Sequence, residues 1–349
     1  MPERIVVLTP NWLGDAVMAL PAVGAVRHHH PAATLVVAAR ASNAALFRMV
    51  SGVDEVISLD AGGGWRGAAA WAADVRALAA AHADLAVLFP NSFRSAWTAR
   101  QAGIPDRWGF AADLRGGLLT RRVPKPRGRM HQSEYYQALV SALGMPLAGA
   151  SACVHISDET AARAAGLLAR HGVAEHAAVV GMAPGAAYGR AKQWPPERFG
   201  RLARLLHERR GVVSVVVGSR ADRAAGDDSG GGGSVVNLIG QTDLPLLAGV
   251  MARCRAFVSN DSGAMHLAAA VGLPVTAIFG STDERATAPL NSVSAPAPPH
   301  EILTCDVWCR PCMLRECPID HRCMTGIDPE RVCEAVERQI AHRSASVES

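Results

Sequence analysis

Short apolar runs alternate with amphipathic or alanine-rich helical stretches along most of the chain, and this alternation constrains the fold more than any other feature. The runs fall at residues 5–8, 35–38, 55–59, 85–89, 179–182, 212–217, 235–238, 256–259 and 275–279. Such a rhythm is typical of βαβ units stacked on a parallel sheet. Because the same rhythm occurs in both halves, the sequence predicts an α/β protein with two Rossmann-like parallel sheets.

The chain length suits two domains, since 349 residues exceed one ordinary domain and 49% hydrophobic residues suffice for two cores. We predict a first domain over residues 1–160, a second over 161–326, and a final helix with its tail over 327–349 that returns to the first domain. The glycine run at 230–233 predicts a surface loop. Open parallel sheets bind ligands at the carboxyl ends of their strands, so we expect both domains to face one central cleft.

The charge balance argues against nucleic acid as a partner, because the formal net charge is only +4. Nine Arg or Lys residues against two Asp nevertheless lie within residues 94–129. This basic stretch would attract an anionic ligand or lipid headgroup, or is simply a solvated surface. Residues 1–4 lead directly into the first apolar run, so no signal peptide is predicted. The longest uncharged stretch, 262–282, predicts a buried helix and strand, and we expect a cytoplasmic protein.

Asp15 is the first candidate for chemistry. It follows the first predicted strand and stands at the start of the next helix, just after Gly14. A helix start favours the ionised carboxylate, which suits a group that accepts a proton from an attacking hydroxyl. The alternative is an ordinary helix cap.

The segment 184–195 follows the predicted strand 179–182 and is a candidate anion-binding loop. Its small residues Gly185 and Ala186 would let backbone N–H groups approach an anion, and Lys192 would neutralise a phosphate. We expect Trp194 to pack the loop down.

A second anion-binding candidate follows the strand 256–259, where Asp261 precedes Ser262 and Gly263 at a predicted helix start. Exposed N–H groups at a helix start suit a diphosphate. His266 lies four residues after Ser262 and therefore on the same helix face. Beyond the strand 212–217, Asp222 could accept hydrogen bonds from ribose hydroxyls.

Several common nucleotide motifs are missing from the sequence. There is no G-x-G-x-x-G fingerprint after the first strand, no Walker loop and no D-x-D pair. Hydride transfer and NTPase chemistry thus lose their main support. Lys192 and helix dipoles could hold a diphosphate without a metal ion, so we expect no cofactor for catalysis.

Taken together, these motifs resemble family-nine glycosyltransferases, the ADP-heptose:lipopolysaccharide heptosyltransferases. The matching pieces are N-W-L-G-D at residues 11–15, P-G-A with K-x-W-P within 184–195, and N-D-S-G-x-M-H at 260–266. Similarity extends over roughly residues 4–290. Residues 90–95 and 102–105 look closest to the heptosyltransferase II branch.

The resemblance implies a GT-B fold and an inverting transferase that moves a heptose from ADP-heptose to the inner core of lipopolysaccharide. By this resemblance the catalytic residues are Asp15, which is the base, and Lys192. The donor is held by Gly185, Ala186, Lys192, Asp222, Asp261, Ser262, Gly263 and His266. The acceptor is anionic and lies at the inner membrane face, which suggests peripheral membrane contact. Candidate acceptor residues in the first domain are Asn91, Ser92, Arg94 and Arg122.

The tail departs from the family pattern, because residues 305–323 are rich in cysteine. Cys309, Cys312, Cys317 and Cys323 form C-x2-C-x4-C-x5-C. Four clustered cysteines in a cytosolic protein suit a structural zinc ion. An iron–sulfur cluster, oxidised thiols or no ligand at all are the alternatives.

Two other functions are compatible with the motifs. The same donor could serve a small natural-product acceptor, or the chain could bind a nucleotide sugar without catalysis. Asp15 argues against the second, because binding alone does not need a carboxylate opposite the diphosphate loop.

Overall fold

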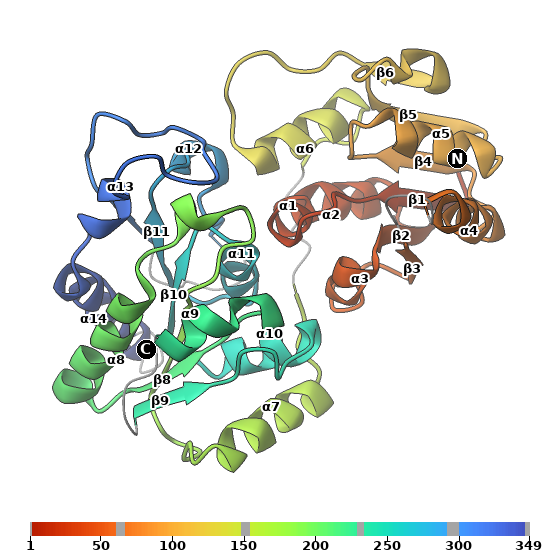
Figure 1. Cartoon of the computed structure of the whole chain (residues 1–349). Coiled ribbons are helices and arrows are strands. Elements are labelled where there is room, and N and C mark those ends of the chain that lie inside the picture. Colours follow the sequence, from red (N-terminus) through yellow and green to blue (C-terminus); the bar gives the residue numbers. More distant parts are fainter. Residues whose placement is uncertain (1, 61–66, 148–153, 229–233, 292–299, 346–349) are drawn as a thin grey trace. The chain divides into compact units, whose positions relative to one another are not determined.

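The computed structural model describes residues 2–60, 67–147, 154–228, 234–291 and 300–345. The chain forms two compact units, Met1–His155 and Ile156–Ser349, and each contains one six-stranded parallel sheet (Figure 1). The division falls five residues before the boundary that the sequence predicts. The glycine run at 230–233 lies outside the described residues. The α/β class with two parallel sheets is confirmed.

The sheet of the first unit has the strand order β3-β2-β1-β4-β5-β6. Its strands are β1 (Arg4–Leu8), β2 (Thr34–Arg40), β3 (Glu55–Leu59), β4 (Leu85–Leu88), β5 (Asp106–Phe110) and β6 (Arg121–Val123). In the centre, Val6 pairs with Val36 on one side and Ala86 on the other. Burial on both faces explains why the central strands are continuous apolar runs.

The helices of the first unit are α1 (Leu13–Met18), α2 (Leu20–His29), α3 (Ala41–Phe47), α4 (Gly67–Ala80), α5 (Phe93–Gln101) and α6 (Gln132–Ala142). The sequence predicts one helix over 16–28, but the structure breaks it between Met18 and Leu20. Pro21 has no N–H to donate to the Val17 carbonyl, so a continuous helix would lose that hydrogen bond. Leu78 of α4 and Ala96 of α5 pack in one core with the central strands.

The second sheet has the order β12-β11-β10-β7-β8-β9. Its strands are β7 (Val179–Ala183), β8 (Val213–Val216), β9 (Val235–Asn237), β10 (Ala256–Asn260), β11 (Val275–Phe279) and β12 (Glu301–Thr304). Numbered within its own unit, each sheet therefore has the order 3-2-1-4-5-6. In this arrangement the first and fourth strands are neighbours and the strand order reverses between them, which defines the position where such sheets bind ligands.

The helices of the second unit are α7 (Asp158–Arg170), α8 (Pro196–Arg210), α9 (Arg223–Asp228), α10 (Leu244–Ala252), α11 (Gly263–Ala270), α12 (Glu284–Thr287), α13 (Arg322–Thr325) and α14 (Pro329–Ala345). Helix α8 has proline at its first position and ends at Gly211, whose φ is 63°. Both are ordinary helix boundary signals.

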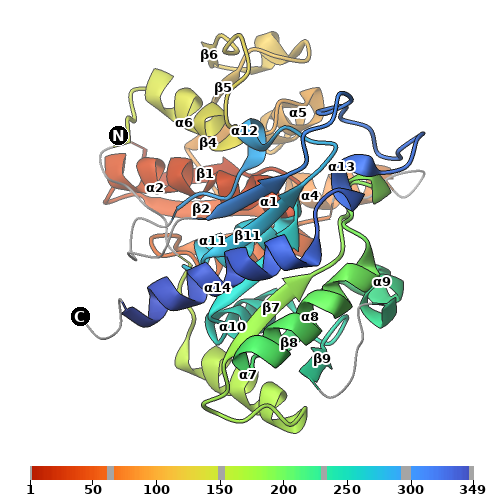
Figure 2. The same ribbon diagram turned by 90° about the vertical axis from the view of Figure 1, so that its left-hand side faces the viewer.

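Helix α14 packs beside α8 on the second sheet (Figure 2). Val332 and Val336 are buried in the same core as Phe199 of α8. Thr276 Oγ1 on β11 donates a 2.9 Å hydrogen bond to Gln339 Oε1. The final helix is thus part of the second core, and its return to the first domain stays a prediction. Among the described residues, every helix falls short of the length and hydrophobicity that a membrane crossing requires.

Candidate active site

The loops after β7 and β10 meet where the strand order of the second sheet reverses. Ser259 pairs with Ala183 at the ends of these strands, which places the next residues, Asn260 and Pro184, side by side. The buried Asn260 donates from Nδ2 to the Pro184 carbonyl at 2.7 Å and accepts at Oδ1 from the Trp194 N–H at 2.9 Å. One amide side chain therefore fixes both ends of the 184–195 loop.

Trp194 anchors the same loop to the core, as the sequence predicts. Its indole is fully buried, donates from Nε1 to the Ile327 carbonyl at 2.9 Å and packs edge-on against Phe199. A buried indole N–H needs such an acceptor. Trp194 therefore holds the loop down rather than offering its ring to a ligand.

Lys192 and Asp261 form a largely buried ion pair between the two loops. The distance from Lys192 Nζ to Asp261 Oδ2 is 2.5 Å, and the side chains are only 13% and 6% exposed. Thr282 Oγ1 donates to the same carboxylate oxygen at 2.7 Å. Lys192 Nζ also lies 4.7 Å from the centre of the Tyr188 ring. These contacts place the ammonium group of Lys192 at the edge of the sheet where the strands have their carboxyl ends.

Helix α11 begins beside this pair, with Ser262 as its N-cap and Gly263 as its first residue. The Ser262 side chain makes no capping hydrogen bond to the helix; its Oγ lies 3.0 Å from Ser259 Oγ. The first N–H groups of a helix have no partner within the helix and attract an anion. His266 is buried one turn further on.

Asp222 reaches the 184–195 loop from the segment after β8. Its Oδ2 accepts from Ser219 N at 2.8 Å and Ser219 Oγ at 2.7 Å. A Cβ at Gly185 would lie 2.2 Å from Asp222 Oδ1, so glycine is required for this close approach. Ala186, the next residue, is buried. The structure thus unites the predicted donor residues of the second unit at one edge of its sheet.

Asp15 lies in the first unit, after β1 and in the first turn of α1. The N-cap of this helix is Trp12, three residues earlier, so Asp15 is not the capping residue. Burial raises the pKa of the Tyr136 hydroxyl, and the negative charge of Asp15 raises it further. The half-buried carboxylate is therefore close to α6.

The predicted acceptor residues have different surroundings. Asn91 Nδ2 donates to Tyr135 Oη at 2.7 Å, and its buried Oδ1 has no hydrogen-bond partner in the described part of the chain. Ser92 caps α5, since its Oγ accepts from Ser95 N at 3.3 Å. Arg94 lies on α5. Arg122 is exposed on the edge strand β6, two strands from β4. The structure does not bring Arg122 to the Asn91 loop.

Arg115 is a buried residue that the sequence analysis did not single out. Its guanidinium donates to the carbonyls of Phe110 and Pro90 and to Ser95 Oγ, and its side chain is fully buried. Burial lowers its pKa to about 10. Arg115 therefore fixes the loop that carries Asn91. Nothing in the sequence distinguishes Arg115, as a buried residue, from the many other arginines of the chain.

A second unpredicted feature is an open aromatic pocket beside Arg94. It has a volume of about 320 Å³ and is lined by Trp71, Phe93, Arg94 and Trp97 together with Gly67 and Ala68. The rings of Phe93 and Trp97 are stacked. Aromatic faces beside an arginine suit a ligand with both apolar and anionic parts.

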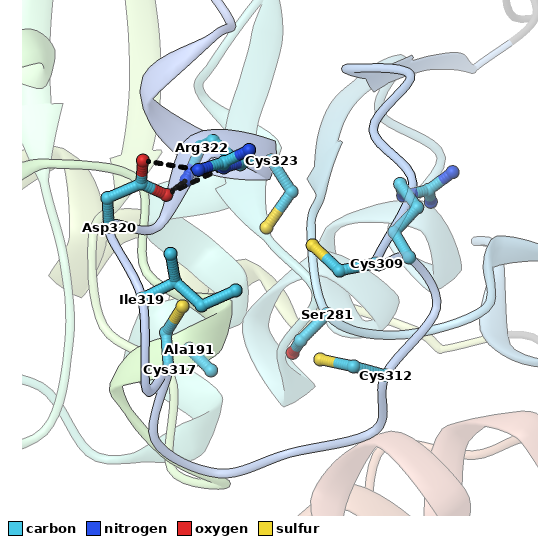
Figure 3. Close-up of a pocket in the computed structure, with 10 residues that line it drawn as sticks. Ala191, Ser281, Cys309, Cys312, Cys317, Ile319, Asp320, Arg322 and Cys323 are labelled. Atoms are coloured by element: carbon cyan, nitrogen blue, oxygen red, sulfur yellow. Dashed lines mark hydrogen bonds and ion pairs between the residues drawn. The ribbon is translucent and has the colours of Figure 1, made fainter.

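The four predicted metal-binding cysteines line one small cavity of the second unit (Figure 3). Burial raises the pKa of the Cys323 thiol, and the neighbouring Cys309, Cys317 and Cys312 raise it further. With the present side-chain positions, no three His, Cys, Asp or Glu groups in the described ranges are arranged to hold a metal ion. The structure therefore brings the four cysteines together without showing a formed metal site.

Two parallel-sheet units, with a cation and a helix start at the reversal point of the second sheet, define a GT-B type glycosyltransferase. A sequence model described as "Glycosyltransferase family 9 (heptosyltransferase)" matches residues 71–322. The chain belongs to this family.

Relatives and solved structures agree with this family. Lipopolysaccharide heptosyltransferase 2 of Escherichia coli K12 is 30% identical over 302 residues, covering 82% of this chain and 86% of the relative. Lipooligosaccharide heptosyltransferase 2 of Haemophilus ducreyi is also 30% identical, with the same coverage. The structure of E. coli ADP-heptose lipopolysaccharide heptosyltransferase II superimposes with a TM-score of 0.81 at 26% identity, covering 98% of this chain and 99% of that one. A family 9 glycosyltransferase from Veillonella parvula gives a TM-score of 0.83 at 20% identity and 97% coverage of both chains, which shows the shared fold.

Proposed function

We propose that this enzyme transfers a heptose from ADP-heptose, with inversion, to the inner core of lipopolysaccharide. The names of its relatives support this substrate pair. The observation that carries the proposal is the Lys192–Asp261 pair beside the start of α11. That arrangement suits a donor whose leaving group is a nucleoside diphosphate.

In the donor site, Lys192 neutralises negative charge that grows on ADP as the glycosidic bond breaks. The backbone N–H groups of Ser262 and Gly263 at the start of α11 add a partial positive charge. Gly185 and Ala186 let the loop approach the diphosphate, and Asp222 accepts from a ribose hydroxyl. Asp261 aligns Lys192 through their 2.5 Å contact, and buried His266 supports the floor of the site.

Asp15 is the proposed base that removes the proton from the attacking acceptor hydroxyl. Its place in the first turn of α1 favours an ionised carboxylate. The N-cap position of this helix is held by Trp12, so Asp15 is not its N-cap residue. A positioned base of this kind contributes about 10²–10⁴-fold to the rate.

The first unit is the proposed acceptor domain. Asn91, Arg94 and the basic stretch around them would meet the anionic core saccharide, and Arg122 would contact it from the edge strand. Ser92 would contribute to the acceptor site mainly by capping the start of α5. Because the proposed acceptor is carried by a lipid of the inner membrane, we propose that the enzyme works in the cytoplasm in peripheral contact with that membrane.

No metal ion is required for this chemistry, because Lys192 and the start of α11 supply the positive charge. The one metal that we propose is a structural zinc ion at Cys309, Cys312, Cys317 and Cys323, which takes no part in the reaction. Added Mg²⁺ should leave turnover unchanged. A strict Mg²⁺ requirement would contradict the metal-independent mechanism.

The proposal is tested by incubating the purified chain with ADP-heptose and a lipopolysaccharide acceptor truncated within the inner core. Mass spectrometry should find the acceptor extended by one heptose, and the Asp15→Asn variant should give almost none of this product. Transfer only to a small soluble acceptor would identify the alternative acceptor class. Tight ADP-heptose binding without transfer to either acceptor would identify a binding protein.

A further inference from the structure

The cysteine-lined cavity lies against the 184–195 loop, which we call the donor loop, because Ala191 of this loop lines it. Its volume is about 20 Å³, which is enough for a single water or ion. Besides the four cysteines, Ala191 and Ser281 line it, and Ala191 precedes Lys192 in the chain. Figure 3 shows the sulfur atoms arranged around this space from the segment 309–317 and from α13.

Polar and cationic groups surround these sulfurs. The His321 N–H donates to Cys317 Sγ at 3.4 Å, and the cationic residues Arg310 and Arg322 line the same cavity. Four cysteine thiolates are a preferred ligand set for structural zinc. Cys312 is exposed and Cys317 half-buried, so both side chains have room to turn towards a common ion.

The stretch between Cys312 and Cys317 holds the donor loop through three contacts. Tyr188 Oη donates to the Met313 carbonyl at 3.1 Å, and Ala191 N donates to the Arg315 carbonyl at 2.9 Å. The Arg315 guanidinium lies 5.0 Å from the centre of the Tyr188 ring, the same ring that Lys192 covers from 4.7 Å. Displacing this stretch would therefore remove contacts of Tyr188, whose ring lies against Lys192, and of Ala191, which directly precedes it.

The same stretch also supports the partner of Lys192. Met313 N donates to the Ser281 carbonyl at 2.8 Å, and the next residue, Thr282, donates to Asp261. Arg310 donates to the Gly280 carbonyl at 3.1 Å and pairs with Glu284 at 2.6 Å. Residues 305–321 contain no helix or strand, so these contacts, and whatever binds the cysteines, hold the segment in place.

We propose that the four cysteines bind one zinc ion and that this ion holds the stretch 312–317 against the donor loop, so that zinc loading sets the affinity for the nucleoside diphosphate. The inference rests on the proposed function only for the identity of that nucleotide. Met313 and Arg315 are positioning residues, because they act through Tyr188, Ala191 and the Asp261 loop.

The experiment measures zinc content by elemental analysis and the ADP dissociation constant by calorimetry on the full chain. Freshly purified protein should contain close to one zinc ion. Cys312→Ser and Cys317→Ser should lose zinc and bind ADP about tenfold more weakly or worse, a change of about 1.4 kcal/mol. Cys305→Ser is the matched control, since Cys305 is a half-buried thiol of the same segment that does not line the cavity. It should keep both zinc and ADP affinity.

Two further measurements cover the case in which the serine variants fail to fold. Tyr188→Phe removes only the hydrogen bond to Met313 and should keep zinc while weakening ADP binding several-fold. Removing zinc from the wild-type chain with a chelator should speed hydrogen exchange of residues 188–192. Wild-type protein that contains no metal or contains iron overturns the zinc site. A zinc-free chain with unchanged ADP affinity and exchange overturns the positioning role.

Failure of the donor assignment is distinguishable from failure of this inference. If UDP binds the wild-type chain better than ADP, the proposed donor is wrong. The same comparison of zinc-loaded and zinc-free protein, made with UDP, then still tests the link between the ion and the donor loop.

Discussion

Replacing Lys192 separates the contribution of the ion pair to stability from its contribution to catalysis. In Lys192→Met, Asp261 stays only 6% exposed and loses the ammonium 2.5 Å away. Leaving one member of a buried pair without its partner costs about 3–5 kcal/mol. Because Thr282 still donates to the carboxylate, we expect the lower end, about 3 kcal/mol. Denaturant unfolding of the wild type and the variant measures this loss.

The double variant Lys192→Met/Asp261→Asn completes a double-mutant cycle with the two single variants. The double variant contains neither charge, so its free energy of unfolding should return to within about 1 kcal/mol of wild type. Compared with the loss in Lys192→Met alone, this means a coupling energy between the two side chains of about 2 kcal/mol or more. Turnover should not return. Both variants that lack Lys192 have lost the charge opposite the leaving diphosphate, and we expect a rate about 10²–10³-fold below wild type.

Two results would refute this reasoning. Stability losses that simply add in the double variant would mean that the two side chains do not form a coupled buried pair. Turnover that recovers together with stability would mean that Lys192 supports the fold and not the transition state. Asp261→Asn alone, which keeps Lys192, is the control for the effect of the carboxylate on donor use.

Three further predictions concern the base, the donor and the acceptor loop. Asp15→Asn should keep its melting temperature and ADP affinity but turn over at least about 100-fold more slowly; a rate within a few-fold of wild type would place the base elsewhere. ADP at a hundredfold excess over its dissociation constant should stabilise the fold by about 2.7 kcal/mol, and an equal shift with UDP or GDP in thermal unfolding would contradict adenine selectivity. Arg115→Met should cost about 3 kcal/mol, because the Pro90 and Phe110 carbonyls each lose a charged donor. An unchanged free energy of unfolding for this variant would mean that the guanidinium does not stabilise the loop that carries Asn91.

The central strands were predictable because they are buried on both faces and are therefore continuous apolar runs. Three strands escaped prediction: β5, β6 and β12. Strand β6 consists of Arg121, Arg122 and Val123, and both arginines are exposed. Strands β6 and β12 are edge strands, where pairing with one neighbour rather than an apolar pattern determines the conformation.

The loops of the donor site were predictable from their place after strands, but their contacts were not. Lys192 and Asp261 are 69 residues apart in the chain, and nothing local to either indicates that they pair. The sequence indicated that Gly185 leaves room for an anion, but nothing local indicated that it also leaves room for Asp222. Ser92 resembled a ligand-binding residue and caps a helix, because a serine before an apolar helix start suits both roles.

The repeated strand order gives this enzyme a modular character. Each sheet has its own reversal point, and the hydrogen bonds of Asn260 that shape the donor loop lie wholly within the second unit. Changes in the loops after β4 and β5 of the first unit therefore leave the hydrogen bonds of Asn260 in place. If the first unit binds the acceptor, as we propose, exchanging its loops between relatives should alter the saccharide that is extended and leave use of the activated sugar unchanged.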